Sequence, residues 1–231
     1  MATARQPALL SPAATLREQR QCAPELLDSL PAESRDAVRS RRDLRRLNAL
    51  MGNFAWFERT LRGRVGAPEK ILELGAGTGE LGLRLARRGF TVAAIDRAPR
   101  PRHWPASAEW HAREIEAFDR WADYPIVIGN LIFHHFDAAR LRVLGQQLDA
   151  HARLILAAEP RRNFTSNLLF TFAATLIGAN HVTRHDGRVS IDAGFHGDEL
   201  AVALGLSPAR WRWSAQPTLR GGYRLIAERK S

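Results

Sequence analysis

The sequence is poor in cysteine and has no long apolar run. Its 231 residues include one cysteine, Cys22. This excludes an internal disulfide and a cysteine-rich zinc site, so we expect a reducing, cytoplasmic location. The longest apolar stretch, residues 168–179, is interrupted by Thr171 and Thr175. It is too short to span a bilayer. Residues 1–15 also lack the apolar centre of a signal peptide, and we expect a frayed tail there.

Lysine is scarce as well, although the chain is basic. The net charge is +10, and only Lys70 and Lys230 among the 34 basic residues are lysines. Arginines are densest over residues 39–46. High positive charge can indicate a nucleic acid or membrane partner. Because these arginines lie off the apolar stripe of a predicted helix, the pattern favours a solvated helix face over a nucleic acid site.

The N-terminal part of the chain has a helical pattern from residue 24 to about residue 64. One apolar stripe recurs at helical spacing, and an aromatic-rich stretch follows Gly52. The stripe is Ala37, Leu44, Leu47 and Met51, and the aromatic-rich stretch contains Phe54, Trp56, Phe57 and Leu61. We predict that residues 1–66 form a tail and a helical lid, with 47–56 nearest the ligand, and that residues 67–231 form the main domain.

From residue 67 onward, strand-like runs alternate with helical ones. This alternation predicts an α/β domain with a mostly parallel, doubly wound sheet. The predicted strands are 71–74, 91–95, 108–111, 125–129 and 153–158, and the predicted helices are 79–88, 138–148, 163–178 and 198–204. The last two strand-like runs, 209–214 and 222–228, have no helix between them. They suit an antiparallel hairpin at the edge of the sheet.

A glycine-rich turn follows the first predicted strand. Glycines at such a turn permit close approach of a ligand to the backbone, and an acid at the end of the next strand can bind both hydroxyls of a ribose. Here that acid is Asp96. Read as Gly77-x-Gly79-x-x-Gly82, the turn matches the dinucleotide fingerprint, which fits a nicotinamide-dependent dehydrogenase.

Read from Glu73, the same turn resembles motif I of the class I S-adenosylmethionine (SAM)-dependent methyltransferases. Glu114-Ile115 after the third strand and the helical extension before the domain fit that family. The segment from Asn130 to Phe136 looks like its fourth motif in small-molecule enzymes, notably those of quinone biosynthesis. The resemblance implies a seven-stranded sheet that closes with an antiparallel pair.

The resemblance also implies which residues bind SAM. The glycines of the turn would accommodate the methionine and ribose, Asp96 would hold the ribose hydroxyls, and Glu114 and Ile115 would flank the adenine. The complete predicted cofactor site is Glu73, Gly75, Ala76, Gly77, Gly79, Asp96, Arg97, Glu114, Ile115, Asn130 and Leu131.

Two features depart from the family pattern. Residues 97–105 contain three prolines, so we predict a loop where the family has a helix. The fourth strand is not followed by the Asn-Pro-Pro-Tyr or Asp-Pro-Pro-Tyr motif that marks many amino-group methylases of adenine and related substrates. A small molecule is therefore favoured as the acceptor.

Three histidines are candidate general bases, since imidazole titrates near neutral pH. His134 and His135 follow the fourth strand, and an alternating pattern predicts that they point in opposite directions. His185 adjoins Asp186 in a segment, 180–190, where the family often inserts substrate-binding elements. Adjacent side chains rarely face each other, so we expect no dyad there. We expect no metal site.

The sequence leaves the acceptor open. The apolar segment 168–179 favours core packing, with the lining of a greasy pocket as the alternative. Arg161 and Arg162 either clamp an acidic substrate group or face solvent. We expect methylation of a small hydrophobic or aromatic molecule, at oxygen rather than carbon. The alternatives are a nicotinamide-dependent dehydrogenase, a non-catalytic SAM-binding protein and an RNA or protein methyltransferase. Nucleic acid binding is disfavoured, and the oligomeric state stays open.

Overall fold

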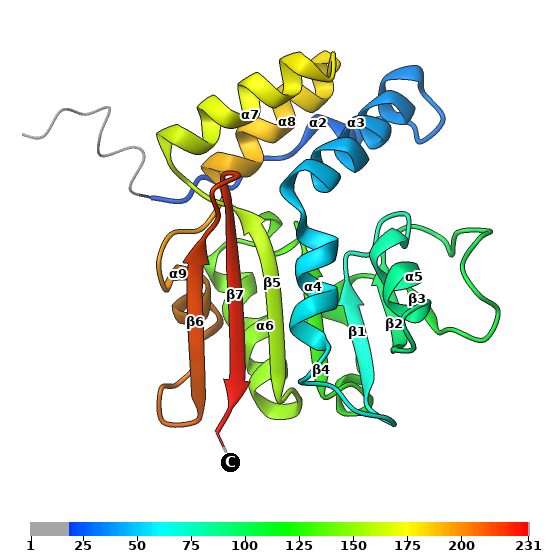
Figure 1. Cartoon of the computed structure of the whole chain (residues 1–231), viewed down its shortest axis with the longest axis vertical. Helices are drawn as coiled ribbons and strands as arrows, with labels where there is room; N and C mark the ends of the chain where they lie inside the picture. The colour runs from blue at the N-terminus through cyan, green and yellow to red at the C-terminus, as the bar shows by residue number, and fades with distance from the viewer. Residues whose placement is uncertain (1–18, 231) are drawn as a thin grey trace, which may run out of the picture.

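The computed structural model describes residues 19–230, and its centre is one seven-stranded sheet (Figure 1). The strand order is β3-β2-β1-β4-β5-β7-β6. The strands are β1 (Lys70–Leu74), β2 (Thr91–Asp96), β3 (Trp110–Ala112), β4 (Ile126–Asn130), β5 (Leu154–Pro160), β6 (Trp211–Pro217) and β7 (Gly222–Arg229). Strands β1 to β5 pair in parallel, whereas β7 pairs antiparallel with both β5 and β6. This confirms the predicted mostly parallel sheet with a C-terminal antiparallel hairpin.

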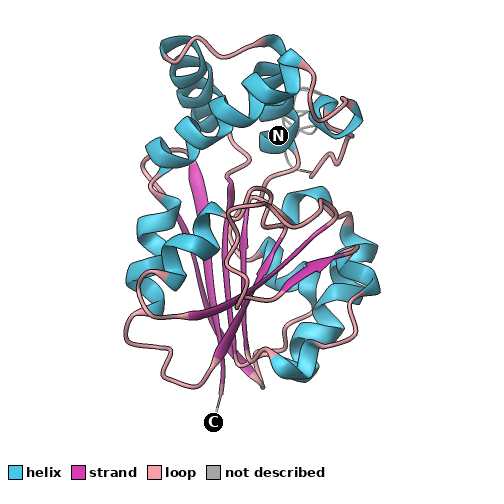
Figure 2. Cartoon of the chain, turned by 90° about the vertical axis from the view of Figure 1, so that its right-hand side faces the viewer, coloured by secondary structure: helices cyan, strands magenta, loops and turns pink. Residues whose placement is uncertain are grey.

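Helices cover the faces of the sheet and also its carboxyl edge (Figures 1 and 2). The helices are α2 (Leu26–Ser29), α3 (Arg35–Met51), α4 (Asn53–Leu61), α5 (Glu80–Ala86), α6 (Ala138–His151), α7 (Phe164–Leu176), α8 (His181–Asp192) and α9 (Glu199–Leu204), with short 3₁₀ turns at Ile115–Ala117, Trp121–Asp123 and Phe133–His135. In Figure 1, α2, α3, α7 and α8 form a cap above the strand ends.

Alternating strand side chains supply two apolar layers. Ile71 of β1 packs with Phe57 of α4 and Leu81 of α5 in one buried cluster. Leu72 and Leu74 point the other way, into a cluster with residues of α6 and α9. A parallel sheet needs both faces covered. Because α4 supplies one of these layers, the N-terminal helices are packed into the core of the sheet as well as over its edge.

The structure tests several expectations about local elements. Residues 97–109 form no helix, as the three prolines predict. Helix α8 occupies the segment expected to bind substrate and was not predicted as a helix. It begins after Asn180, whose side chain accepts a hydrogen bond from the Thr183 N–H. An asparagine at this position is a common signal for the start of a helix.

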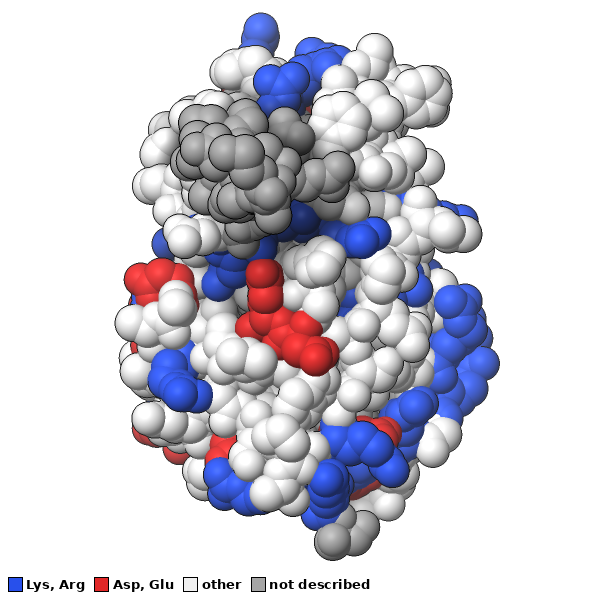
Figure 3. All heavy atoms as spheres, turned by 90° about the vertical axis from the view of Figure 1, so that its left-hand side faces the viewer, with Lys and Arg blue, Asp and Glu red and all other residues white. Residues whose placement is uncertain are grey.

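The surface confirms one expectation and contradicts another. The arginines of α3 at 39, 42, 45 and 46 are exposed, as a solvated face requires. Helix α7 was expected to pack in the core, yet most of its large apolar side chains are exposed. Figure 3 shows basic side chains on the upper and lower parts of one face, with a cluster of acidic ones between them. No helix within residues 19–230 is long and apolar enough to cross a membrane. The N-terminal tail expected over residues 1–15 lies outside the described part.

Candidate functional site

The glycine turn joins the end of β1 to α5 in left-handed backbone conformations. The φ angles are 61° at Gly75, 57° at Gly77 and 77° at Gly79, a region that glycine enters without strain. The Gly77 N–H donates to Asp96 Oδ2 at 2.7 Å, and the Ala98 N–H donates to Asp96 Oδ1 at 2.8 Å. The carboxylate of Asp96 therefore lies against the turn, at the carboxyl edge where open α/β sheets bind ligands.

Space for a ligand is greatest at Gly77. A Cβ atom at Gly75 would clash with the Ile132 side chain, and one at Gly79 would clash with Trp104. At Gly77 nothing lies within 4 Å of that position. The open part of the cradle is thus the middle of the turn, beside Asp96.

Glu73 is a buried carboxyl group without a complete set of partners. It is 3% exposed, and its Oε2 atom has no hydrogen-bond partner. Burial, together with the nearby carboxylates of Asp96 and Glu80, raises the pKa of Glu73 to about 8. An unsatisfied buried polar atom beneath a ligand turn requires an explanation. A ligand carrying an ammonium group near the turn provides one, because it would give the carboxylate a partner.

The residues predicted to surround an adenine are only partly gathered. Ile115 is buried, whereas Glu114 and Arg97 are exposed. The Arg97 guanidinium pairs with Asp28 at 3.1 Å, next to the end of α2. The loop 97–109 instead brings Trp104 over the turn, where the centroids of the Trp104 and Trp110 rings are 5.1 Å apart. The sequence gives no sign of this role for Trp104, because the place of Trp104 depends on the fold of that loop.

Asn130, at the end of β4, is held by the helical cap. Its Nδ2 donates to Asn48 Oδ1 at 3.2 Å, and its Oδ1 accepts from Asn53 Nδ2 at 3.0 Å. The next residue, Leu131, has φ 58°, an uncommon conformation for a residue with a side chain. Such outliers concentrate at functional sites. Asn48 and Asn53 were missed, because only the tertiary structure brings α3 and α4 to β4.

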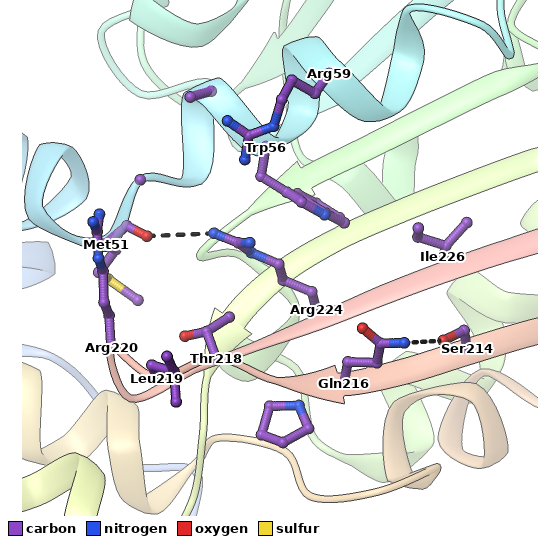
Figure 4. Close-up of a pocket in the computed structure, with 13 residues that line it drawn as sticks. Met51, Trp56, Arg59, Ser214, Gln216, Thr218, Leu219, Arg220, Arg224 and Ile226 are labelled. Carbon is purple, nitrogen blue, oxygen red and sulfur yellow. Dashed lines mark hydrogen bonds between the residues drawn. The ribbon is translucent and has the colours of Figure 1, made fainter.

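A groove lies beside α4, and the arginines that line it fix the junction between α3 and α4 (Figure 4). It has a volume of about 510 Å³ and lies between α4 and the hairpin β6–β7. Arg220 and Arg224 donate to the backbone oxygens of Leu50 and Met51, and Arg224 lies 5.2 Å from the Trp56 ring. These guanidiniums satisfy carbonyls at the C-terminus of α3, where positive charge is favourable. They hold the junction that presents Asn53 to Asn130.

His134 lies in a buried row of ionisable groups at the end of β4. Its Nδ1 is 2.6 Å from Glu159 Oε2, and its Nε2 is 3.5 Å from Glu25 Oε1. The Glu159 carboxylate also accepts from the backbone N–H groups of Ile132 and Phe133, which fixes its orientation. Burial by itself lowers the pKa of His134, but the two carboxylates outweigh it and raise the pKa to about 9. His134 is therefore a cation at neutral pH.

His135 lies beside His134 rather than opposite it. The two rings are 4.3 Å apart and inclined by 33°. The prediction of opposite directions is wrong, because Phe133–His135 is a 3₁₀ turn and not an extension of the strand. Burial lowers the pKa of His135, and the neighbouring positive charge of His134 lowers it further. The turn thus places a neutral imidazole against a charged one.

A segment before α2 covers both histidines; we call residues 20–27 the N-terminal strap. Arg20 donates to the backbone oxygens of Ala193 and Phe136, and Glu25 accepts from the Ser190 hydroxyl. The strap therefore runs from α8 to the end of β4. Glu25 and Glu159 were missed as site residues, since nothing in their local sequence marks them.

His185 forms the pair that was not expected. Its Nδ1 is 2.9 Å from Asp186 Oδ1, so the expectation that these neighbours do not face each other is wrong. The buried Asp186 carboxylate accepts from the N–H groups of Leu26 and Leu27. The hydrogen bonds of the described residues do not link His185 to His134 or His135. The pair anchors α2 and the strap.

Arg162 is neither a free clamp nor a surface residue. It is buried, and its guanidinium donates to both carboxylate oxygens of Glu199 and to the Gly194 backbone oxygen. These contacts connect the end of β5 to the start of α9. Arg162, the second residue after β5, is thus engaged within the protein.

One group in the described part of the chain has a composition suited to a metal ion. Glu25, His134 and His135 each offer a ligand atom, and these atoms lie within 4.8 Å of one another. A carboxylate behind a ligating histidine, as Glu159 stands behind His134, is common in metal sites. The expectation of no metal site stays a prediction.

Comparisons with known proteins bear on the fold. No protein-family model matches the chain, and the search of curated proteins finds no relative. Among solved structures, the plantazolicin methyltransferase BamL, in complex with a triazolic desmethylPZN analog and S-adenosylhomocysteine (SAH), has a TM-score of 0.67 at 11% identity. The match covers 94% of this chain and 99% of that one.

Two further solved structures are similar to this chain over most of their length. The plantazolicin methyltransferase BpumL with SAH has a TM-score of 0.63 at 11% identity, covering 86% of this chain and 92% of that one. The Burkholderia thailandensis 1,6-didemethyltoxoflavin-N1-methyltransferase, with its substrate and SAH bound, has a TM-score of 0.58 at 19% identity, covering 98% and 93%. The described chain therefore has the α/β fold of the class I SAM-dependent methyltransferases.

Proposed function

We propose that this protein is a SAM-dependent methyltransferase that acts on a small hydrophobic or aromatic molecule, at oxygen. One arrangement carries the proposal: the glycine turn with Asp96 and the unsatisfied Glu73 lies at the same sheet edge as His134 and His135. SAH in the three similar structures supports the choice of cofactor.

The chain's own residues suit SAM in polarity and shape. Asp96 would accept hydrogen bonds from the ribose hydroxyls, the open space at Gly77 would admit the ligand, and Glu73 would complement the ammonium of the methionine moiety. Ile115 would pack on the adenine. Asn130, held on both sides by Asn48 and Asn53, would lie next to the reacting centre.

SAM supplies a methyl group already bonded to a sulfonium, so the protein chiefly aligns and deprotonates the acceptor. An acceptor hydroxyl must lose its proton, and His135 is the neutral base available for it. His134, kept cationic by Glu159 and Glu25, would stabilise the oxyanion that forms. When the environment separates the pKa values of two neighbouring groups, one group can act as the acid and the other as the base.

The other functions have less support. The order 3-2-1-4-5-7-6 with an antiparallel β7 departs from the order 3-2-1-4-5-6 of dinucleotide-binding folds, which disfavours a dehydrogenase. A non-catalytic SAM-binding protein would not need two histidines with separated pKa values. The arginines of α3 are spread over a solvated face, which gives little reason for an RNA methyltransferase.

Calorimetric titration of the full chain with SAH tests the cofactor. We expect binding, and an Asp96→Ala variant should bind about 10-fold to 100-fold more weakly, since hydrogen bonds from the ribose to a charged group contribute about 1.5–3 kcal/mol. An Asp119→Ala variant, which alters an exposed surface carboxylate, is the matched control. Absence of SAH binding, or binding of NADH in its place, would refute the proposal. Turnover that survives a chelator would separate the base mechanism from a metal at Glu25, His134 and His135.

A further inference from the structure

Helix α7 leaves an unusually apolar surface on the cap of the molecule. Leu168, Phe172 and Leu176 recur every four residues, and each is at least 59% exposed. Residues at this spacing are neighbours on a helix surface. Leu169 is 38% exposed beside them. Soluble monomers seldom expose contiguous apolar patches of this kind without a partner.

The packing of α7 shows that this face is not turned toward the core. The ring of Phe170 lies against Gly187 of α8, and Ala174 and Ser166 are buried. These residues make the inner side of the helix, and the apolar row lies outside it. Leu219, in the turn between β6 and β7, is fully exposed, and the backbone of Gly221 nearby approaches Ser166. The turn between β6 and β7 therefore lies near the start of α7.

Arginines lie at the C-terminal end of this patch, and acidic residues are missing from it. Residues 161–185 contain no aspartate or glutamate. At the C-terminal end of α7, Arg184 donates to the backbone oxygens of Ala174 and Ala179, and Arg39 of α3 donates to that of Gly178. Arg188 adds an exposed charge on α8. Helix α3 alone carries six arginines against two acidic residues.

We propose that α7 and its arginine border bind the surface of an anionic lipid bilayer. An apolar helix face with arginines at its edge lies in the plane of a membrane interface, with the apolar side chains among the acyl chains and the guanidiniums at the phosphates. The helix has 13 residues and is far too short to span a bilayer, so it would lie on the surface.

The positive charge next to the patch favours a bilayer over a second copy of the chain as its partner. A symmetric pair of copies would bring the same patch of each together. Arg39, Arg184 and Arg188 of both copies would then meet, and no carboxylate of residues 161–185 would offset them. Anionic lipid removes this repulsion and complements the border.

This surface adjoins the proposed active site without being part of it. Helix α8, against which α7 packs, holds Leu26 and Leu27 of the N-terminal strap through Asp186. A bilayer bound at α7 would thus lie next to the segment that covers His134 and His135. The membrane proposal does not require the methyl-transfer proposal, because lipid binding is measured without cofactor or acceptor.

Co-sedimentation of the full chain with vesicles tests the proposal. One set of vesicles contains phosphatidylglycerol and phosphatidylcholine, and the other contains phosphatidylcholine alone. We expect binding to the anionic vesicles that weakens with salt. The double variant Phe172→Glu with Leu176→Glu should lose at least about tenfold in partitioning, because two large side chains no longer enter the acyl region.

The control is Val202→Glu, which places a carboxylate at an apolar position of α9 that is 65% exposed, away from the cap. It should bind vesicles as the unaltered chain does, and circular dichroism should show that all variants are folded. Failure of the unaltered chain to sediment, or unchanged binding of the double variant, would overturn the proposal. So would a dimer that the double variant dissociates, since that result assigns the patch to a second copy.

Discussion

At the scale of single residues, the site depends on two adjacent histidines in different electrostatic environments. Glu159 and Glu25 flank His134, whereas His135 faces the positive charge of His134 itself. The two carboxylates thus raise the pKa of His134, whereas burial and the charge of His134 lower the pKa of His135. The sequence singled out both histidines but showed neither carboxylate partner.

The pH dependence of turnover follows from these shifts. Turnover should rise as pH increases through the lowered pKa of His135, because the base must be neutral. It should fall near pH 9 as His134 loses its proton. In Glu159→Gln, one of the charges that raise the pKa of His134 is gone, so the falling limb of the kcat profile should move to lower pH.

The contact between His134 and Glu159 also predicts how stability depends on pH. The pKa of His134 is higher in the folded state than the ordinary value of 6.5, so its stabilising contribution is complete below that value and is lost as pH rises through about 9. Thermal unfolding of the unaltered chain should shift downward over this window, and Glu159→Gln should shift less. An unchanged kcat profile in Glu159→Gln would show that His134 takes no part in turnover.

At the scale of elements, α8 determines where the N-terminal strap lies. The Asp186 carboxylate caps the first N–H groups of α2, and the Ser190 hydroxyl holds Glu25. Residues 20–27 include no buried side chain, and α2 buries none either. The position of the strap therefore depends on hydrogen bonds to α8.

Replacing Asp186 should release the strap without unfolding the sheet. We expect Asp186→Ala to lower kcat about tenfold or more, because Glu25 would no longer be held at His134 and positioned groups of this kind contribute about 10²-fold to 10⁴-fold to proton transfer. The affinity for SAH, which depends on the glycine turn, should stay the same. Steady-state kinetics and calorimetry measure the two effects separately.

Asp192→Ala is the matched control, since it makes the same change at an exposed position of the same helix. It should leave both kcat and SAH affinity unchanged. Equal losses in the two variants would mean that α8 tolerates no change, and a loss of SAH binding in Asp186→Ala would place the effect outside the strap.

At the scale of the whole molecule, stability depends on how closely the helices approach on each face of the sheet. Gly145 of α6 lies so near the backbone of Leu204 in α9 that a Cβ atom there would overlap it. A neighbouring backbone cannot move aside as a flexible side chain can. This contact lets α9 close the apolar layer over β5 and β7.

Gly145→Ala should therefore lower the free energy of unfolding by about 1–3 kcal/mol, the range for overpacking, despite the better helix propensity of alanine. Denaturant unfolding followed by circular dichroism measures it. Gly66→Ala is the control, because nothing lies within 4 Å of its Cβ position and its φ is not positive. An unaltered or increased stability in Gly145→Ala would contradict the close packing of α6 and α9.

The sequence by itself determined the local motifs and the order of the elements. Alternating strand and helix patterns predicted the sheet and its closing hairpin, and the glycine turn with Asp96 was legible because both lie within one short segment. The prolines of residues 97–105 correctly predicted a loop. These features depend on periodicity and backbone conformation, which neighbours in the chain control.

Only the tertiary structure decided the partners of the site. Glu25, Asn48, Asn53 and Glu159 come from four separate segments, and only the packing of the chain brings them to the end of β4. Side-chain charge states follow from those contacts, and so does the exposure of α7, whose composition resembles a core helix. Burial and electrostatics depend on which segments meet in space, and an apolar or polar pattern along one segment does not contain that information.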